Sequence, residues 1–332
     1  MAEATLDVVG IGNAMVDVMT HADEAFLASQ GLVKGAMTLI DAARADQLYA
    51  VMPPAIEISG GSAGNAIAGL ASLGARAAYI GKVCDDQLGR VYRHDIRAIG
   101  VQFDVAPATT GSTGRCLILV TPDAQRTMQT YLGAGSDLGP EDVDDALIAS
   151  AQVTYLEGYL WDPPRAKEAF LKAAAIAHGA GRRFALSLSD PFCVERHREE
   201  FRDLVQGHVD LIFANESEIT SLYEVATFDE ALQHVRGACE IAALTRSAHG
   251  SVIVRGDEVH VLAAEPVEKV VDTTGAGDLY AAGFLYGLTH RMDLALCGRI
   301  AGIAAAEVIS HFGARPEVSL ADLVRHTLDL AS

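Results

Sequence analysis

Val270-Val271-Asp272-Thr273-Thr274-Gly275-Ala276-Gly277-Asp278 is the stretch that decides the fold. Its two β-branched residues predict the end of a strand, a Gly-Ala-Gly turn follows, and Asp278 opens a helix rich in small residues. The first turn of a helix has backbone N–H groups without partners, and the helix dipole favours an anion there. A carboxylate beside that anion is unfavourable unless it takes a proton from a hydroxyl that attacks phosphorus. The alternative for these residues alone is an ordinary helix start with an N-terminal Asp.

The composition is that of a globular chain with a full core. The 332 residues are 50% hydrophobic, a length that allows one large domain or two smaller ones. The formal net charge of −19 makes nucleic acid and anionic membranes poor partners. Five cysteines without a CxxC pair indicate reduced thiols and a cytoplasmic protein without disulfides or a zinc ribbon. Neither a signal peptide nor a membrane span is expected.

Alternation of strands and helices predicts the main architecture. Predicted strands cover 6–11, 37–40, 56–59, 77–83, 101–105, 153–156, 184–188, 211–214, 241–245, 251–255 and 259–262. Predicted helices cover 25–30, 42–50, 66–73, 85–99, 164–178, 195–205, 217–223, 228–240 and 294–312. Because the strands are nearly continuous apolar runs, we expect an α/β fold with a mostly parallel central sheet covered by helices on both faces.

A β-rich segment interrupts this alternation. Residues 113–121 and 127–132 predict a hairpin that turns at Pro122-Asp123-Ala124. We assign it to a small β-sheet lid beside the main domain. The predicted division is a large domain of residues 1–13, 44–109 and 132–332, which binds nucleotide and substrate, and a lid of residues 14–43 and 110–131.

Two glycine-containing motifs of nucleotide-binding proteins are absent. Gly10-Ile11-Gly12 lacks the third glycine of the dinucleotide fingerprint, because position 15 is Met15, so an NAD-linked oxidoreductase is disfavoured. Gly81-Lys82 is followed by Val83 and lacks the first glycine of a Walker P-loop. Any phosphate chemistry must therefore depend on the turn before Asp278.

Two other stretches could hold a small polar substrate. Asn13 and Asp17 would point to the same face of an extended segment and could bind adjacent hydroxyls. The alternative is a turn Asn and an exposed Asp. The run from Gly60 and Gly61 through Ser62 to Asn65 places paired glycines before a helix, which permits close approach by a ligand or simply close helix–sheet packing.

The string Asp272–Asp278 resembles the signature of the ribokinase/PfkB family of small-molecule kinases, and the resemblance extends over nearly the whole chain. It implies a ribokinase-like fold that uses ATP and Mg²⁺. Asp278 would be the catalytic base, and the turn Gly275-Ala276-Gly277 would surround the transferred phosphoryl group. Asp272 and Thr274 would help to hold a monovalent cation such as K⁺.

The substrate motifs resemble those of the adenosine kinases within this family. The four-residue spacing of Asn13 and Asp17, and the sequence Gly61-Ser62 followed by Asn65, carry this likeness. The resemblance also implies that Arg126 and Leu132 of the hairpin cover the substrate. An exposed hairpin arginine without a role is the alternative for Arg126.

The same resemblance implies a nucleotide site. Asn215 and Glu218 match a motif that organises Mg²⁺ through water, although an acid-rich helix start would look alike. Thr245 and Gly250 match a nucleotide loop in which Ser247 replaces the usual glycine. The helix around Ala305 would border adenine, and Gly313-Ala314-x-Pro316 resembles the closing turn near the cation.

These features predict transfer of the ATP γ-phosphate to a primary hydroxyl of a nucleoside, with adenosine as the leading acceptor. A sugar kinase of the same family, acting on ribose, fructose or 2-keto-3-deoxygluconate, is the second hypothesis. A ligand sensor that kept the fold without catalysis is the third. The protein would be a monomer or a homodimer.

Overall fold

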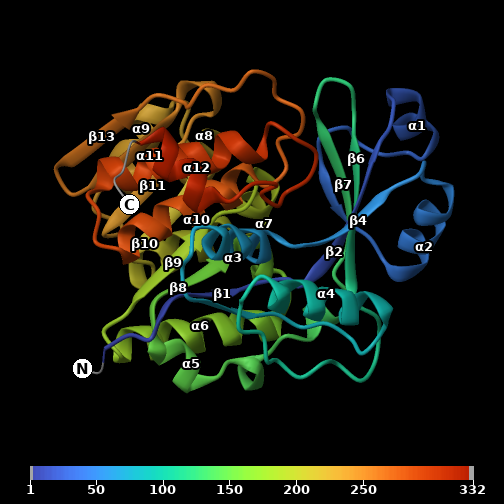
Figure 1. The fold of residues 1–332 in the computed structure, drawn as a ribbon, viewed down its shortest axis with the longest axis horizontal. Coiled ribbons are helices and arrows are strands. Elements are labelled where there is room, and N and C mark those ends of the chain that lie inside the picture. Colours follow the sequence, from blue (N-terminus) through green and yellow to red (C-terminus); the bar gives the residue numbers. More distant parts are fainter. Residues whose placement is uncertain (1–2, 329–332) are drawn as a thin grey trace.

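The computed structural model describes residues 3–328, which form two sheets side by side (Figure 1). The larger sheet has eight strands in the order β13-β12-β11-β10-β9-β8-β1-β5. Their bounds are β1 Leu6–Ile11, β5 Ala77–Ile80, β8 Ala151–Glu157, β9 Arg183–Ser187, β10 Leu211–Asn215, β11 Ile241–Thr245, β12 Ser251–Arg255 and β13 Glu258–Leu262. The strands from β5 to β11 are parallel, and β12 and β13 are antiparallel. The predicted mostly parallel sheet is confirmed.

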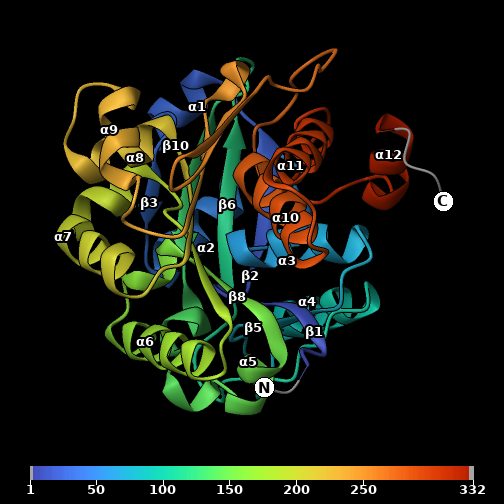
Figure 2. The same cartoon turned by 90° about the vertical axis from the view of Figure 1, so that its left-hand side faces the viewer.

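Helices cover both faces of this sheet (Figure 2). One face packs against α3 Ser62–Ser72, α4 Gln87–Ala98, α10 Ala276–Thr289, α11 Leu294–Val308 and α12 Leu320–Thr327. The other packs against α5 Asp145–Ser150, α6 Pro164–Gly179, α7 Pro191–Gly207, α8 Glu216–Tyr223 and α9 Phe228–Val235. Because both faces are covered, strands such as β8 are buried along nearly their whole length.

The smaller sheet has five strands in the order β3-β7-β6-β2-β4. Their bounds are β2 Met15–His21, β3 Met37–Leu39, β4 Ile56–Gly60, β6 Gly114–Val120 and β7 Arg126–Tyr131. The predicted hairpin is present as the antiparallel pair β6–β7. Strand β4 lies in the range that we expected in the large domain, yet it pairs antiparallel with β2, so this sheet is wider than the predicted lid.

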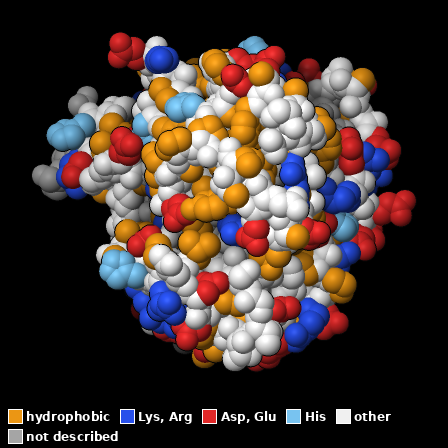
Figure 3. Space-filling model, turned by 90° about the vertical axis from the view of Figure 1, so that its right-hand side faces the viewer, with side chains coloured by type: hydrophobic (Ala, Val, Ile, Leu, Met, Phe, Trp, Pro, Cys, Tyr) orange, Lys and Arg blue, Asp and Glu red, His pale blue; other side chains and the backbone are white. Residues whose placement is uncertain are grey.

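Helices α1 Glu24–Ser29 and α2 Ala42–Val51 lie beside the smaller sheet at the right of Figure 1. Hydrophobic side chains gather on the face of the molecule that is seen from this side (Figure 3). Large hydrophobic side chains that stay exposed in this part of the chain are Val33, Leu39, Tyr49, Val51 and Ile56.

The chain passes between the two sheets at points that carry predicted site residues. Residues 12–14 connect β1 of the large sheet directly to β2 of the small one, and β4 leads through Gly61 into α3. The topology therefore places Asn13, Asp17 and Ser62 at the junction of the two sheets.

Several local predictions are wrong; for example, the helix expected to reach 312 ends at Val308, and the strand expected to reach 83 ends at Ile80. The chain has no strand at Val271, because residues 263–273 are irregular and β13, the edge strand of the large sheet, already ends at Leu262. The N–H of Val271 donates to the carbonyl of Ile309 instead. Residues 101–105 form only an isolated bridge at Gln102, and the helix expected to reach 240 ends at Val235.

In the part of the chain that the structure describes, no helix is long and apolar enough to cross a membrane.

Candidate active site

The turn before α10 is held in one conformation by glycine and by a buried carboxylate. Gly275 has φ +80°, and a Cβ there would lie 2.9 Å from atoms of Ala314, so only glycine fits. Asp272 Oδ1 accepts hydrogen bonds from the N–H and the hydroxyl of Thr274, at 2.9 and 2.6 Å. Its Oδ2 accepts from the N–H of Gly313 at 3.1 Å. Asp272 therefore fastens the turn to the loop after α11.

Asp278 lies in the first turn of α10 and faces the start of α3. The Ser62 hydroxyl donates to Asp278 Oδ1 at 2.6 Å, and Asn65 Nδ2 donates to Oδ2 at 3.0 Å. Burial raises the pKa of Asp278, and these two hydrogen bonds oppose the rise. Because each carboxylate oxygen has two lone pairs, the group can still accept a hydrogen bond from a substrate hydroxyl.

Asn13 is anchored to the large sheet by a residue that the sequence analysis missed. Glu157, at the end of β8, accepts from the backbone N–H and the Nδ2 of Asn13 at 2.9 and 2.7 Å. It also accepts from the N–H of Ala63, at 2.7 Å, in the first turn of α3. Burial raises the pKa of Glu157 to about 7, against these donors. The Oδ1 of Asn13 is buried without a partner in the described part of the chain.

Asp17 comes from the small sheet and has a carboxylate that is available to a ligand. Its side chain packs on Gly60, where a Cβ would lie 2.0 Å from Oδ2. Within residues 3–328 no hydrogen bond to this carboxylate is formed, although the residue is only 5% exposed. Burial raises its pKa to about 7; the charge of Asp278 adds to the rise, and Arg126 opposes it. Gly61, with φ +84°, lies where the chain passes from β4 of the small sheet into α3.

Arg126 is the first residue of β7, and Leu132 follows its last residue. The positive charge of Arg126 lowers the pKa of Asp17, Asp278 and Glu218, so the guanidinium faces the same region as these carboxylates. It makes no hydrogen bond or ion pair with any residue that the structure describes, which leaves it free to meet an anion. Leu132 packs against the small cluster around Met15 and Cys116.

The predicted nucleotide residues lie at the carboxyl ends of β10 and β11 and beyond. Asn215 caps α8: its Oδ1 accepts from the N–H of Glu218 at 2.9 Å, and Glu218 Oε2 accepts from the N–H of Asn215 at 2.9 Å. Burial raises the pKa of Glu218 to about 7, and the charge of Asp278 contributes to the rise. Thr245 ends the neighbouring strand in register with Asn215.

The loop after Thr245 keeps a glycine-like backbone without the glycine. Ser247 has φ +49°, a left-handed conformation that glycine adopts freely and that costs a serine free energy. Gly250 has φ +82°, and a Cβ there would lie 1.9 Å from the carbonyl oxygen of Leu262. Ala305 is half-buried on α11 and packs against the core. These residues are not in hydrogen-bond contact with Asp278.

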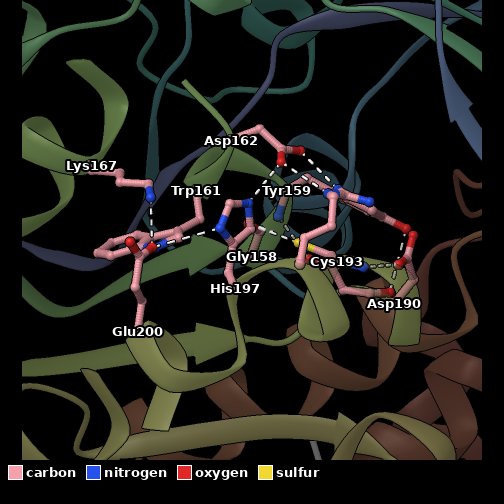
Figure 4. Close-up of polar contacts among 11 residues, drawn as sticks. Gly158, Tyr159, Trp161, Asp162, Lys167, Asp190, Cys193, His197 and Glu200 are labelled. Carbon is pink, nitrogen blue, oxygen red and sulfur yellow. Dashed lines mark hydrogen bonds and ion pairs between the residues drawn. The ribbon is translucent and has the colours of Figure 1, made fainter. Parts of the chain in front are cut away.

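A polar network supports the segment that follows β9 (Figure 4). Asp190 caps α7 by accepting from the N–H of Cys193 at 2.6 Å, and its charge contributes to the raised pKa of Glu218. Asp162 accepts from Arg196, at 2.9 Å, and bonds to His197 Nε2 at 2.8 Å. His197 has non-helical backbone angles at a kink in α7. The network thus fixes the segment that carries Asp190.

A comparison with protein-family models finds that residues 46–320 match the model of the pfkB family carbohydrate kinases. The chain belongs to this family. Its structure is similar to that of adenosine kinase from Sinorhizobium meliloti, with 54% identity, a TM-score of 0.95, and coverage of 98% of this chain and 100% of that one. It is also similar to a probable sugar kinase protein from Rhizobium etli CFN 42, at 50% identity and a TM-score of 0.96, with the same coverage.

Among curated proteins, the adenosine kinase of Saccharomyces cerevisiae is 27% identical over 313 residues, which is 87% of this chain and 91% of that protein. This pfkB kinase is therefore a phosphotransferase that acts on an alcohol group of a sugar or nucleoside. The ribokinase-like fold predicted from the Asp272–Asp278 string is confirmed by the same neighbours. ATP binding is implied by the family.

The carboxylates of this pfkB kinase fit a divalent metal that arrives with nucleotide phosphates. Among residues 3–328, no group of three or more His, Cys, Asp or Glu side chains could hold a metal ion alone. Mg²⁺ commonly takes one or two carboxylates, several waters and substrate phosphates. Each oxygen of Glu218 accepts one hydrogen bond from Asn215, which leaves a lone pair on each that could meet a water bound to such an ion. Asp272 accepts two hydrogen bonds on Oδ1 and one on Oδ2, so Oδ2 keeps a lone pair that could meet a monovalent cation.

Proposed function

We propose that this protein transfers the γ-phosphate of ATP to the 5′-hydroxyl of a nucleoside, with adenosine as the acceptor. The observation that carries the proposal is the carboxylate of Asp278. It is partly buried in the N-terminal turn of α10 and oriented by Ser62 and Asn65 of α3. A base that is held in position next to the N-terminal amides of a helix is an arrangement that suits phosphoryl transfer.

In the proposed mechanism, the ribose of the acceptor lies between Asn13 and Asp17. The unbonded carboxylate of Asp17 accepts from the ribose hydroxyls, and the unpaired Oδ1 of Asn13 accepts from a further donor. This places the primary hydroxyl at Asp278, which takes its proton as the oxygen attacks the γ-phosphorus.

The charge that develops on the transferred group is stabilised by the chain itself. The amides of Gly275, Ala276 and Gly277 hold its oxygens at the helix N-terminus, and Arg126 approaches from the hairpin. Mg²⁺ would neutralise the ATP phosphates, with Glu218 beside it, and Thr245, Gly250 and Ala305 would border the nucleotide. We propose that Asn215 acts by orienting Glu218.

The likeness to two adenosine kinases supports a nucleoside acceptor. A sugar acceptor is the second candidate, because the Rhizobium etli neighbour at 50% identity is a probable sugar kinase. A sensor without catalysis is disfavoured by the retained Asp278.

A single coupled assay tests the proposal. It compares kcat/KM for adenosine, 2′-deoxyadenosine, ribose, fructose and 2-keto-3-deoxygluconate with ATP as donor. We expect adenosine to be the best acceptor and 2′-deoxyadenosine to be much poorer, because loss of a hydroxyl leaves the buried carboxylate of Asp17 unpaired. A sugar that exceeds adenosine would replace the nucleoside assignment with the sugar-kinase alternative, and no turnover of any acceptor would favour the sensor.

A further inference from the structure

Arg315 lies behind the catalytic carboxylate, in the loop after α11, and no motif points to it. Its Nε donates to Asn65 Oδ1 at 3.0 Å. The other end of the same amide, Nδ2, donates to Asp278 Oδ2. Arg315, Asn65 and Asp278 therefore form a continuous hydrogen-bonded chain.

The chemistry of the guanidinium fixes the direction of this chain. An arginine side chain has donors only, so the amide of Asn65 must turn its oxygen toward Arg315. That orientation leaves the NH₂ group for the carboxylate of Asp278. Without Arg315, the amide could rotate by half a turn and present its oxygen to Asp278, where it would repel the carboxylate.

Arg315 also acts through its charge. In the described residues it forms no ion pair with a carboxylate, and its Nη2 is buried without a partner. Its positive charge opposes the effect of burial by lowering the pKa of Asp278 and of Asp17. A partly buried positive charge that is not neutralised by a neighbour favours the ionised form of both groups.

Other charged groups face Asp278 from the surrounding elements, and they also influence its pKa. Arg126 from β7 also favours the ionised form. The electrostatic neighbours that can carry negative charge are Asp17 from β2, Glu157 from β8 and Glu218 from α8. Tyr155 of β8 also interacts with Asp278, but burial raises the pKa of its phenol well above the usual range, so it stays neutral. Because acidic groups predominate around Asp278, removal of one of two arginines should have a measurable effect.

We propose that Arg315 is a positioning residue for the transfer reaction: it holds the Asn65 amide in the orientation that binds Asp278, and it supplies an unpaired positive charge to this region. The proposal rests on the proposed function for the role of Asp278. A purely structural alternative is that Arg315 only joins the loop after α11 to α3.

The experiment compares Arg315→Gln, Arg315→Lys and a matched control, Arg325→Gln. Arg325 is a half-exposed arginine on α12 that pairs with Asp322. Each purified protein is assayed for kcat and KM across pH, with Asp278→Asn as the reference for loss of the base. Thermal melting identifies variants that fail to fold.

For Arg315→Gln, we expect kcat to fall roughly 10- to 100-fold with little change in KM, because a base and its positioning contribute about 10²–10⁴ together. The acidic limb of the kcat profile should move to higher pH by about one unit, the shift expected when a neighbouring positive charge is lost. Arg315→Lys keeps the charge, so the acidic limb should stay near that of the wild type while kcat stays reduced. Arg325→Gln should match the wild type in both. A kcat and an acidic limb that are unchanged in a folded Arg315→Gln variant would overturn the proposal.

A readout that is independent of turnover separates this proposal from the proposed function. The carboxyl resonance of Asp278, assigned by its loss in Asp278→Asn, is titrated by NMR in the wild type and in Arg315→Gln. A higher pKa in the variant supports the role of Arg315 even if adenosine proves not to be the acceptor. An equal pKa in both proteins refutes the electrostatic part, whatever the acceptor is.

Discussion

The change of Asp278 to Asn tests the centre of the proposed mechanism. Asparagine is nearly isosteric with aspartate, but it cannot take a proton from the acceptor. Loss of a general base usually lowers the rate by about 10²–10⁴, which corresponds to about 3 to 5 kcal/mol of activation free energy. We therefore expect kcat for adenosine to fall by at least about a hundredfold.

The hydrogen bonds of Asp278 predict how the variant protein will rearrange. The new side chain has one oxygen, which can keep the bond from the Ser62 hydroxyl. Its NH₂ group would then face the NH₂ of Asn65, and Arg315 prevents the Asn65 amide from turning. One lost hydrogen bond and two opposed donors should lower the free energy of unfolding by about 1–3 kcal/mol, partly offset because a buried charge is removed.

The assay measures kcat and KM with saturating ATP, together with the urea dependence of unfolding. The control is Ser62→Ala, which removes a donor to Asp278 but keeps the base. That variant should lose less activity than Asp278→Asn. A decrease in kcat of less than tenfold for a folded Asp278→Asn protein would show that Asp278 is not the base.

Burial raises the pKa of Asp17 from 3.8 to about 7, so the folded protein holds a proton that the unfolded chain releases. The unfolding free energy should therefore fall between about pH 4 and pH 7, and urea titrations should show a smaller fall for Asp17→Asn; equal slopes would contradict this. Gly61→Ala should lower both stability and activity, because a Cβ would lie 2.1 Å from the Asn13 carbonyl oxygen at φ +84°. A Gly61→Ala protein with the melting temperature of the wild type would contradict this prediction. Deletion of the turn at 122–124 should raise the ratio of ATP hydrolysis to transfer, because an open lid admits water, and an unchanged ratio would exclude a lid role. K⁺ should increase activity over a bulky organic cation at equal ionic strength; equal rates, with an active Asp272→Ala variant, would argue against a cation site.

The sequence predicted the turn and helix start at Asp278 well, because the features that form them are local. A glycine turn, small residues and an acid at a helix start act within one or two turns of chain. The strand predicted at Val270 and Val271 failed because a strand needs a partner at the right place, and the sheet edge ends at β13. Local β-propensity does not contain that information.

The missed residues depend on contacts that are distant in sequence. Glu157 is 144 positions from Asn13, and Arg315 is 250 positions from Asn65. A signal for Glu157 was present, since an acid at the end of an apolar buried strand needs a partner. Arg315 occupied an unspecified position of the closing turn. Likewise, β4 joined the small sheet through pairing with β2 that no local pattern indicates.

The short connection between Asn13 and Asp17 has a mechanical consequence. Asn13 is tied through Glu157 to β8 of the large sheet, whereas Asp17 belongs to β2 of the small sheet. A substrate that bonds to both residues would link the two sheets at the place where residues 12–14 join them, so its binding energy would favour their close approach. An acceptor that lacks one of the two hydroxyls would occupy the same place without forming the contact to the second sheet. Recognition of the acceptor and exclusion of water would then be one event, driven by the same pair of hydroxyls.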